Sequence, residues 1–371
     1  MKPLSLPARY LWPTAVLRLF KNLTSQNPTK VGATACHHSA GDPIMKQLNV
    51  IFLPHPVKVS MFNPWGMDVV KAVSRNHNMH VLDYDKPLAP QFEGMDAVID
   101  HGGSAGTREM VDAATDARLW QILGTGFDHF DLDYWKTTGI PVANCPGAFS
   151  AVALAETAMM FILMLTRRYP EARTLLDEGE LYEPMGLELE GQQLGIIGFG
   201  ASGIELARRA MPFGMKIAAI DIREVSDGER QEFGLSFVGT PDDLEKVVAE
   251  SDILSLHLHL NSETHHIIDA RMLGLMKPTA YIINVARGAL IDEQALTKAL
   301  LDGRLGGAGI DAYSQEPPDL SSPFFKLPNV IATPHTAGVT DGTSRKRAQC
   351  AADNVDRVAA GLEPLYRIDL E

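Results

Sequence analysis

The 371-residue chain has few cysteines, no excess of positive charge and no long apolar run, and each shortage excludes a class of protein. Its three cysteines, Cys36, Cys145 and Cys350, are too sparse for a disulfide framework and form no C-x-x-C metal or redox motif. The net charge of −13, without a stripe of Lys or Arg, argues against binding to nucleic acid. No apolar run reaches the roughly 18–20 residues that a membrane span needs. We therefore expect a cytoplasmic protein without a membrane or nucleic-acid partner.

Hydrophobic residues make up 45% of the chain and charged residues 21%, an ordinary mix for a protein with a packed core. The length predicts two domains. Residues 1–44 differ from the rest, because they hold five basic residues and one acid without a sustained apolar period. A transit-type leader has this composition, whereas a secretory signal would be interrupted by Arg18 and Lys21. We favour a third interpretation, a poorly ordered basic extension that ends where the ordered pattern begins at Met45.

From Met45 onward, short apolar runs alternate with longer periodic stretches, a pattern typical of parallel sheets covered by helices. The first series predicts strands at 48–53, 80–84, 97–100, 119–123 and 142–144, and helices at 65–76 and 108–117. A long apolar helix is predicted at 151–168, and the polar stretch 178–190 after it indicates a domain junction. The second series predicts strands at 193–198, 216–221, 253–256, 280–285, 307–311 and 330–332, and helices at 202–213, 242–249, 270–275, 293–302 and 343–360. The predicted fold class is α/β, with two doubly wound parallel-sheet units in series.

A glycine motif, G-x-G-x-x-G, begins at Gly198, after an apolar run and before a predicted helix. Gly198 permits the tight turn, Gly200 lets the backbone approach a pyrophosphate, and Gly203 lets helix and strand pack closely. The helix N-terminus that follows offers unpaired N–H groups to the phosphates. The motif predicts a dinucleotide site. The competing interpretation is an ordinary strand–helix turn in a sheet that binds another ligand.

Asp221 ends the next predicted strand and makes the dinucleotide interpretation more specific. Its carboxylate can accept hydrogen bonds from both ribose hydroxyls and would repel a 2′-phosphate. This favours NAD over NADP, although Arg223 lies two residues further on.

Arg287, Glu316 and His335 each follow a predicted strand, and the ligand crevice of an open α/β sheet lies outside the carboxyl ends of its strands. We therefore expect all three near one edge, beside the nicotinamide ring. Oxidation of a hydroxy acid needs a base for the hydroxyl proton, and histidine suits that role near neutral pH. Glu316 would stabilise the imidazolium of His335, and Arg287 would bind the substrate carboxylate and polarise its carbonyl oxygen.

Each of these side chains also has a structural interpretation, as an ion-paired arginine, a loop glutamate or a satisfied histidine. Other chemistries fit less well, because no G-x-S-x-G serine motif is present. His265 and His266 are adjacent and cannot both face one metal, and His257 and His259 share a strand face without a third ligand. We therefore predict no metal site. The glycine-rich stretch 101–107 is either a flexible turn or a loop whose N–H groups face an anion.

Taken together, the motifs resemble the D-isomer-specific 2-hydroxyacid dehydrogenases, which include phosphoglycerate, glycerate, D-lactate and formate dehydrogenases. The matching segments are LGIIGFGASG at 194–203, MKPTAYIINVARGALIDE at 276–293, GIDAYSQEPP at 309–318, TPHTAG at 333–338, LGTGFDHFDL at 123–132 and GIPVAN at 139–144. They are spread over most of the chain from about Met45 to Gly361, and the combination is far more specific than any one motif.

The resemblance implies a discontinuous, flavodoxin-like substrate domain at 45–149 and 334–371, with a Rossmann NAD domain inserted at 150–333. It implies that Arg287, Glu316 and His335 are the catalytic set, and that the substrate carboxylate is clamped by the backbone of Gly102, Gly103 and Ser104 together with Arg287. The expected cofactor contacts are Gly198, Gly200, Ala201, Ser202, Gly203, Asp221, His257, Ala286 and Asp311. It also implies a small 2-hydroxy or 2-keto acid substrate, cleft closure between the domains, and a homodimer to which the helix at 151–168 contributes.

The chain also departs from the family pattern. His101 lies where many members carry Arg-Ser, which argues against phosphoglycerate itself as the substrate of this phosphoglycerate dehydrogenase-like chain. No regulatory domain is expected after the last helix. Two alternatives compete with a dehydrogenase, namely an NAD-responsive binding protein like the family's corepressors, and a formate dehydrogenase. Glu316 counts against the latter, because formate has no hydroxyl proton to remove.

Overall fold

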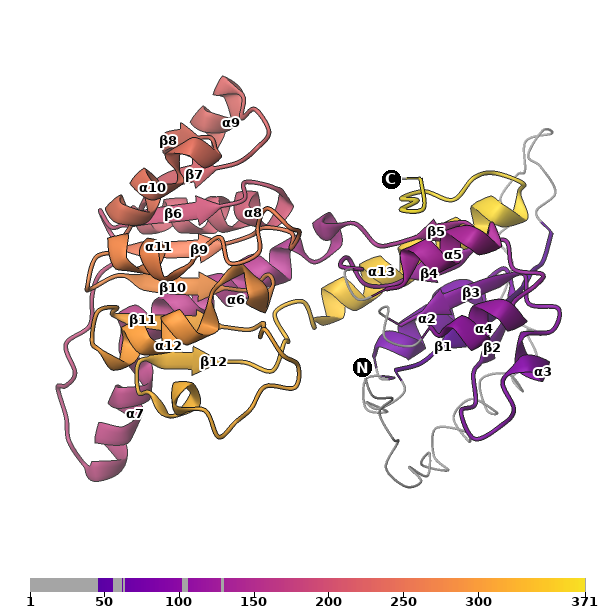
Figure 1. Ribbon diagram of the computed structural model, residues 1–371, viewed down its shortest axis with the longest axis horizontal. Coiled ribbons are helices and arrows are strands. Elements are labelled where there is room, and N and C mark those ends of the chain that lie inside the picture. Colours follow the sequence, from indigo (N-terminus) through magenta and orange to yellow (C-terminus); the bar gives the residue numbers. More distant parts are fainter. Residues whose placement is uncertain (1–45, 56–61, 63, 102–105, 128–129, 371) are drawn as a thin grey trace, which may run out of the picture.

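The computed structural model describes residues 46–55, 62, 64–101, 106–127 and 130–370, which form two α/β lobes side by side along the longest axis (Figure 1). Each lobe is built on one parallel sheet. The predicted extension, residues 1–44, lies outside the described residues, as do Gly102, Gly103 and Ser104. Within the described ranges, no helix has the length and apolar character needed to cross a membrane.

The first sheet has five parallel strands in the order β2-β1-β3-β4-β5. Their bounds are β1 Asn49–Leu53, β2 Asn78–Val81, β3 Ala97–Asp100, β4 Trp120–Ile122 and β5 Val142–Ala143. Alternate residues of β1 enter different cores, with Val50 and Phe52 on one face and Ile51 and Leu53 on the other. Such buried alternation is expected when helices cover both faces of a sheet.

Helices from both ends of the described chain cover this sheet. They are α2 Trp65–Val73, α3 Ala89–Phe92, α4 Arg108–Ala113, α5 Leu132–Thr138 and α13 Asp341–Ala359. The last of these, α13, packs against α2, and the Ser344 hydroxyl donates to the Asp68 carboxylate at 2.6 Å. Asn354 donates to the buried Gln121 side chain at 2.6 Å. Segments on either side of the second lobe in sequence therefore build the first lobe together.

The second sheet has seven parallel strands in the order β12-β11-β10-β9-β6-β7-β8. Their bounds are β6 Gln193–Ile197, β7 Lys216–Ile220, β8 Leu235–Gly239, β9 Ile253–Leu256, β10 Tyr281–Asn284, β11 Gly307–Ile310 and β12 Val330–Ala332. The strand order reverses between β6 and β9, and ligands of doubly wound sheets bind at such a reversal.

The helices of the second lobe are α6 Ala151–Thr166, α7 Tyr169–Glu178, α8 Ala201–Ala210, α9 Asp227–Glu232, α10 Leu244–Glu250, α11 Ala270–Leu275 and α12 Glu293–Leu301. Helices α10, α11 and α12 cover one face of the second sheet and α6 and α8 cover the other, whereas α7 and α9 have no buried residues. On one face, α6 approaches β11 so closely that a Cβ added at Gly309 would lie 2.6 Å from the Phe161 Cβ. The predicted long apolar helix thus packs against the sheet.

The predicted fold class is confirmed, but sequence reasoning missed several elements. Pro170 sits in the first turn of α7, where a proline is tolerated, and no helix was predicted between residues 168 and 193. Helix α9 begins with a capping box between Ser226 and Glu229, and it precedes the edge strand β8. Strand β8 is only partly buried along its length, so its apolar signal is weak.

Candidate active site

The glycine loop after β6 has the geometry that the motif predicted. Gly198 has φ +95°, a left-handed conformation that favours glycine, and an added Cβ would lie 2.6 Å from the His257 carbonyl oxygen. A Cβ at Gly203 would lie 2.2 Å from the Gly198 oxygen, so helix and strand meet too closely for a side chain. A Cβ at Gly200 would meet nothing within 4 Å. The packing roles of Gly198 and Gly203 are confirmed, and the backbone at Gly200 borders open space.

Asp221 lies directly after β7 and beside this loop. Its carboxylate accepts hydrogen bonds from the backbone N–H groups of Phe199, at 2.5 Å, and Arg223, at 2.9 Å. The Arg223 guanidinium turns instead to the Phe199 carbonyl oxygen, at 2.9 Å, and to the two carboxylate oxygens of Glu229, at 2.8 and 3.1 Å. The hydrogen bonds from Arg223 and Ser226 lower the pKa of Glu229 to about 2. Arg223 is therefore engaged within the chain.

His257 lies just below the glycine loop, at the end of β9. Its ring nitrogens exchange hydrogen bonds with the hydroxyls of Ser202, at 3.0 Å, and Ser255, at 2.9 Å. Burial lowers the pKa of His257 to about 4, so the ring is neutral at neutral pH. The ring therefore braces the first turn of α8 through Ser202, while Ala201 is exposed at the start of that helix.

Glu316 and His335 come together across the carboxyl edge of the second sheet. The His335 Nδ1 lies 2.8 Å from each of the two carboxylate oxygens of Glu316. The two side chains are 44% and 41% exposed, so a ligand can reach them. When Nδ1 donates to Glu316, Nε2 is the nitrogen left to exchange a proton with a substrate.

The same pairing sets the charges of both groups. The hydrogen bond to Glu316 raises the pKa of His335 above its ordinary value, against the opposing effect of burial. Burial is the largest single influence on Glu316 and opposes its ionisation. The hydrogen bonds from His335 and the Tyr313 N–H, together with the charges of His335 and Arg287, outweigh it and lower the pKa of Glu316. Arg287 follows β10, and its positive charge acts on both groups. The three predicted catalytic side chains therefore share one electrostatic environment. The residue before Arg287, Ala286, is buried.

The segment that carries His335 is held by a buried aspartate. Asp311, fully buried, accepts hydrogen bonds from the Thr333 hydroxyl at 2.6 Å, the Thr336 N–H at 2.7 Å and the Ala337 N–H at 2.9 Å. His335 has φ +54°, a left-handed conformation that costs a non-glycine residue about 1–2 kcal/mol. Hydrogen bonds to a charged group contribute about 1.5–3 kcal/mol each and can offset that cost. Sequence reasoning assigned Asp311 to the cofactor, and its bracing of the His335 segment was missed.

Tyr313 was also missed as a supporting residue. Its backbone N–H donates to Glu316 at 3.1 Å, and its hydroxyl donates to the Thr333 carbonyl oxygen at 2.8 Å. It therefore ties the Glu316 segment to the His335 segment. The available signal was its position two residues after a predicted strand end, in the same short run as Glu316.

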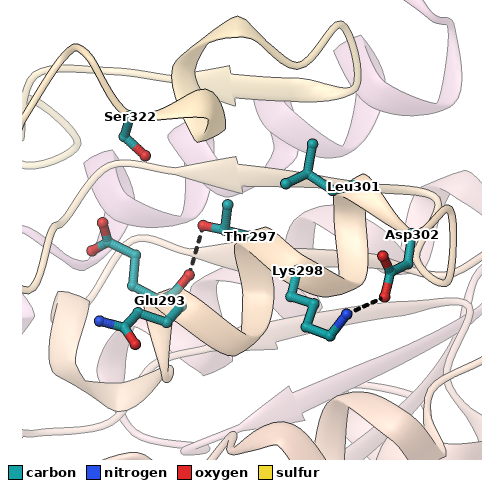
Figure 2. A pocket seen from close by; sticks show the side chains of 7 residues that line it. Glu293, Thr297, Lys298, Leu301, Asp302 and Ser322 are labelled. Atoms are coloured by element: carbon teal, nitrogen blue, oxygen red, sulfur yellow. Dashed lines mark hydrogen bonds and ion pairs between the residues drawn. The ribbon is translucent and has the colours of Figure 1, made fainter.

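An open surface hollow of about 390 Å³ lies on α12 and includes Ser322, as Figure 2 shows. Its charged Lys298 and Asp302 pair with each other at 2.9 Å, and the Thr297 hydroxyl donates to the Glu293 carbonyl oxygen at 2.7 Å. None of the predicted site residues lines it. Among the described residues, no group of three or more His, Cys, Asp or Glu side chains could hold a metal ion.

Comparison with known proteins identifies the family. Residues 159–337 match the family model described as "D-isomer specific 2-hydroxyacid dehydrogenase, NAD binding domain". A glyoxylate reductase of Thermofilum pendens is 36% identical over 269 residues, which are 71% of this chain and 78% of that protein. The chain belongs to the D-isomer-specific 2-hydroxyacid dehydrogenases. It therefore carries the family's NAD-binding domain, which confirms the cofactor prediction.

Other relatives place this dehydrogenase within the family. A D-3-phosphoglycerate dehydrogenase of Methanocaldococcus jannaschii is 32% identical over 312 residues, which are 82% of this chain but only 58% of that protein. A crystal structure of D-lactate dehydrogenase from Aquifex aeolicus, complexed with NAD and lactic acid, superposes with a TM-score of 0.70. It is 27% identical, and the alignment covers 84% of this chain and 96% of that one.

Proposed function

We propose that this chain is an NAD-dependent oxidoreductase that interconverts a small D-2-hydroxy acid and its 2-keto acid. The observation that carries the proposal is the hydrogen-bonded pair of His335 and Glu316, 2.8 Å apart. This pair stands within the electrostatic reach of Arg287. Relatives named glyoxylate reductase and hydroxypyruvate reductase support a short substrate.

NAD fits the glycine loop and the residues around it. Gly200 leaves open space over the backbone, and no side chain of the N-cap residue binds the N-terminal N–H groups of α8, which suit a pyrophosphate. Asp221 offers a carboxylate to the ribose hydroxyls. Because the Arg223 guanidinium is bound to Glu229, it is not positioned to bind a 2′-phosphate beside Asp221, which favours NAD over NADP. Bound NADH supplies the hydride.

The chain's own residues handle the carboxylate and the proton. Arg287 binds the substrate carboxylate and draws electron density toward the carbonyl oxygen. In the reductive direction, protonated His335 gives its Nε2 proton to that oxygen. Glu316 keeps the ring oriented and stabilises its cationic form, so that the proton is available near neutral pH. In the oxidative direction, neutral His335 accepts the hydroxyl proton.

The domain division and the assembly are part of the proposal. We place the substrate domain at 45–149 and 334–371 and the NAD domain at 150–333, and the packing of α13 against α2 supports this division. A homodimer is supported by large apolar side chains exposed after α7, since Leu181, Tyr182 and Met185 are 62%, 100% and 87% exposed. A cytoplasmic location is supported by the free, buried thiols of Cys145 and Cys350.

A panel of 2-keto acids with NADH tests the proposal. Glyoxylate, hydroxypyruvate and pyruvate are mixed with the protein, and NADH absorbance is followed. Oxidation of NADH with at least one of them is the expected result, and hydroxypyruvate or pyruvate, whose products are chiral, should give the D-configured 2-hydroxy acid. NADH binding without any turnover would reject the enzyme and favour the NAD-responsive binding protein.

A further inference from the structure

Three polar side chains outside the assigned site meet at the carboxyl edge of the first sheet. Trp65 begins α2, His101 directly follows β3, and Arg347 lies on α13. The guanidinium carbon of Arg347 lies 5.3 Å from the centre of the Trp65 ring system. The His101 ring is 5.9 Å from that of Trp65, and the charge of Arg347 acts on His101. We call these residues the Trp65–His101–Arg347 cluster.

The cluster holds buried nitrogens whose hydrogen-bonding capacity is unused. Among the described residues, the Trp65 Nε1, both ring nitrogens of His101 and the Arg347 Nε are buried without a hydrogen-bond partner. Trp65 and His101 are only 5% and 6% exposed. Folded proteins leave few such groups unsatisfied, because each unmet donor or acceptor is destabilising. Trp120 and Trp135 also have unpaired indole N–H groups. Their rings pack against each other, with centroids 5.3 Å apart.

The cluster also carries positive charge that no described carboxylate neutralises. The Arg347 guanidinium makes one hydrogen bond, from Nη2 to the Thr125 hydroxyl at 3.4 Å, and no ion pair within the described ranges. Burial lowers the pKa of Arg347, and the charge of Arg287 lowers it further. Burial lowers the pKa of His101 to about 4, with His55 and Arg347 adding to the effect. An anion bound here would offset the repulsion between the charges of Arg287 and Arg347 and would accept hydrogen bonds from the unpaired donors.

We propose that the Trp65–His101–Arg347 cluster binds a second acidic group of the substrate, a carboxylate or a phosphate, at the end remote from the keto carbon. The inference rests on the proposed function, in which Arg287 binds the first carboxylate. Arg287 follows a strand of the second sheet and Arg347 belongs to the first lobe, so each lobe contributes one guanidinium. The positive charge of Arg287 acts on Arg347. A substrate with acidic groups at both ends would pair with both.

The bound group would meet three kinds of donor. The guanidinium of Arg347 offers its Nε–H and a terminal N–H in the planar fork that suits carboxylate and phosphate oxygens. The neutral His101 ring offers one N–H, and Trp65 offers its indole N–H. A purely structural stacking of Arg347 on Trp65 would explain the ring contact but leave these nitrogens unsatisfied.

The test compares substrates with one and two acidic groups. Two ratios of kcat/KM are measured in the wild type and in Arg347→Met. The first is that of 2-oxoglutarate to pyruvate, and the second is that of phosphohydroxypyruvate to pyruvate. We expect one of these ratios to fall roughly 10–100-fold in the variant, the size of a lost hydrogen-bonded charge pair. The ratio that falls identifies carboxylate or phosphate. In Arg347→Lys, which keeps the positive charge, the same ratio should fall less.

Arg345→Met is the matched control, because Arg345 lies on the same helix and pairs with Asp341 at 2.8 Å at the surface. Unchanged ratios in Arg347→Met, or an equal fall in Arg345→Met, would overturn the subsite. His101→Gln gives a second variant, expected to lower the same ratio, if Arg347→Met does not fold.

Thermal unfolding separates this inference from the proposed function. If the wild type turns over no 2-keto acid, the proposed function fails. The subsite is still supported if 2-oxoglutarate or phosphohydroxypyruvate raises the Tm of the wild type and not that of Arg347→Met. It is overturned if neither compound raises the Tm of the wild type, or if both proteins respond alike.

Discussion

The carboxyl edges of the two sheets differ in how their polar groups are satisfied. At the second sheet, Asp311 accepts three hydrogen bonds from the chain, and Glu316 meets His335 directly. At the first sheet, His101 and the Arg347 Nε are buried without hydrogen-bond partners among the described residues. The segment that carries His335 is therefore held by hydrogen bonds within the chain, whereas the first edge holds buried donors that no described residue satisfies.

The difference separates a rigid site for the proposed chemistry from a site that we propose for substrate recognition. Chemistry needs a proton donor held in one orientation, and a satisfied network supplies that. Recognition of a variable substrate needs groups that remain available until the substrate arrives. Unsatisfied buried groups lower stability, so their presence at the edge where we propose a substrate subsite indicates a functional reason.

His335→Ala tests the satisfied edge most severely. Loss of the proposed acid/base should lower kcat/KM for the reduced 2-keto acid by roughly 10²–10⁴-fold, while NADH affinity is retained. Steady-state rates and NADH fluorescence titration measure the two effects. His80→Ala, on the exposed end of β2, is the control and should leave both unchanged. A fully active His335→Ala protein would remove the mechanism.

Glu316→Gln tests the electrostatic half of the same pair. Without the carboxylate, the raised pKa of His335 should fall. Reduction needs the protonated ring, so reductive kcat/KM should begin to decline at lower pH than in the wild type. Oxidation needs the neutral ring, so its rise should also move to lower pH. We expect the reductive rate near neutral pH to drop roughly 10–100-fold, and pH profiles in both directions check the sign.

Asp221→Asn tests the nucleotide side of the second sheet. The amide oxygen can still accept from the Phe199 N–H, but the charge that would repel a 2′-phosphate is gone. The ratio of kcat/KM with NADPH to that with NADH should rise about tenfold, a change of about 1.4 kcal/mol. Asp227→Asn, exposed on α9, should leave the ratio unchanged. An unaltered ratio in Asp221→Asn would contradict the ribose role.

Thr333→Val measures how much the satisfied edge depends on one hydrogen bond. Valine keeps the shape of threonine but leaves buried Asp311 short of a donor, so the free energy of unfolding should fall by about 1.5–3 kcal/mol. Urea denaturation gives the value. Thr174→Val, on exposed α7, is the control and should change it by less than about 0.5 kcal/mol. Equal effects would erase the contrast between the two edges.

His101→Leu should act in the opposite direction. Replacing a buried ring that has no hydrogen-bond partner with an apolar side chain should raise the free energy of unfolding by about 1 kcal/mol. The same variant should lose preference for substrates with two acidic groups. Destabilisation would show that His101 has hydrogen-bond partners in solution and that the two edges do not differ in this respect.

Much of the site followed from local sequence patterns. The glycine spacing from Gly198 to Gly203 predicted a close backbone approach, and in the fold a Cβ added at Gly203 would lie only 2.2 Å from the Gly198 oxygen. Strand ends at Arg287, Glu316 and His335 predicted one shared edge, since parallel strands bring their carboxyl ends together. Helix α7, helix α9 and strand β8 were missed, because a proline, a short length and partial burial weakened their signals.

The α/β class, the family, the dinucleotide loop and the candidate catalytic side chains could be predicted from the sequence alone, because these depend on period, spacing and residue chemistry. Only the tertiary structure decided that Asp311 braces the His335 segment, that Glu229 holds Arg223, and that Arg347 reaches Trp65 and His101. These contacts join residues from separate segments of the fold. Their partners depend on how helices and loops pack, and no local pattern carries that information.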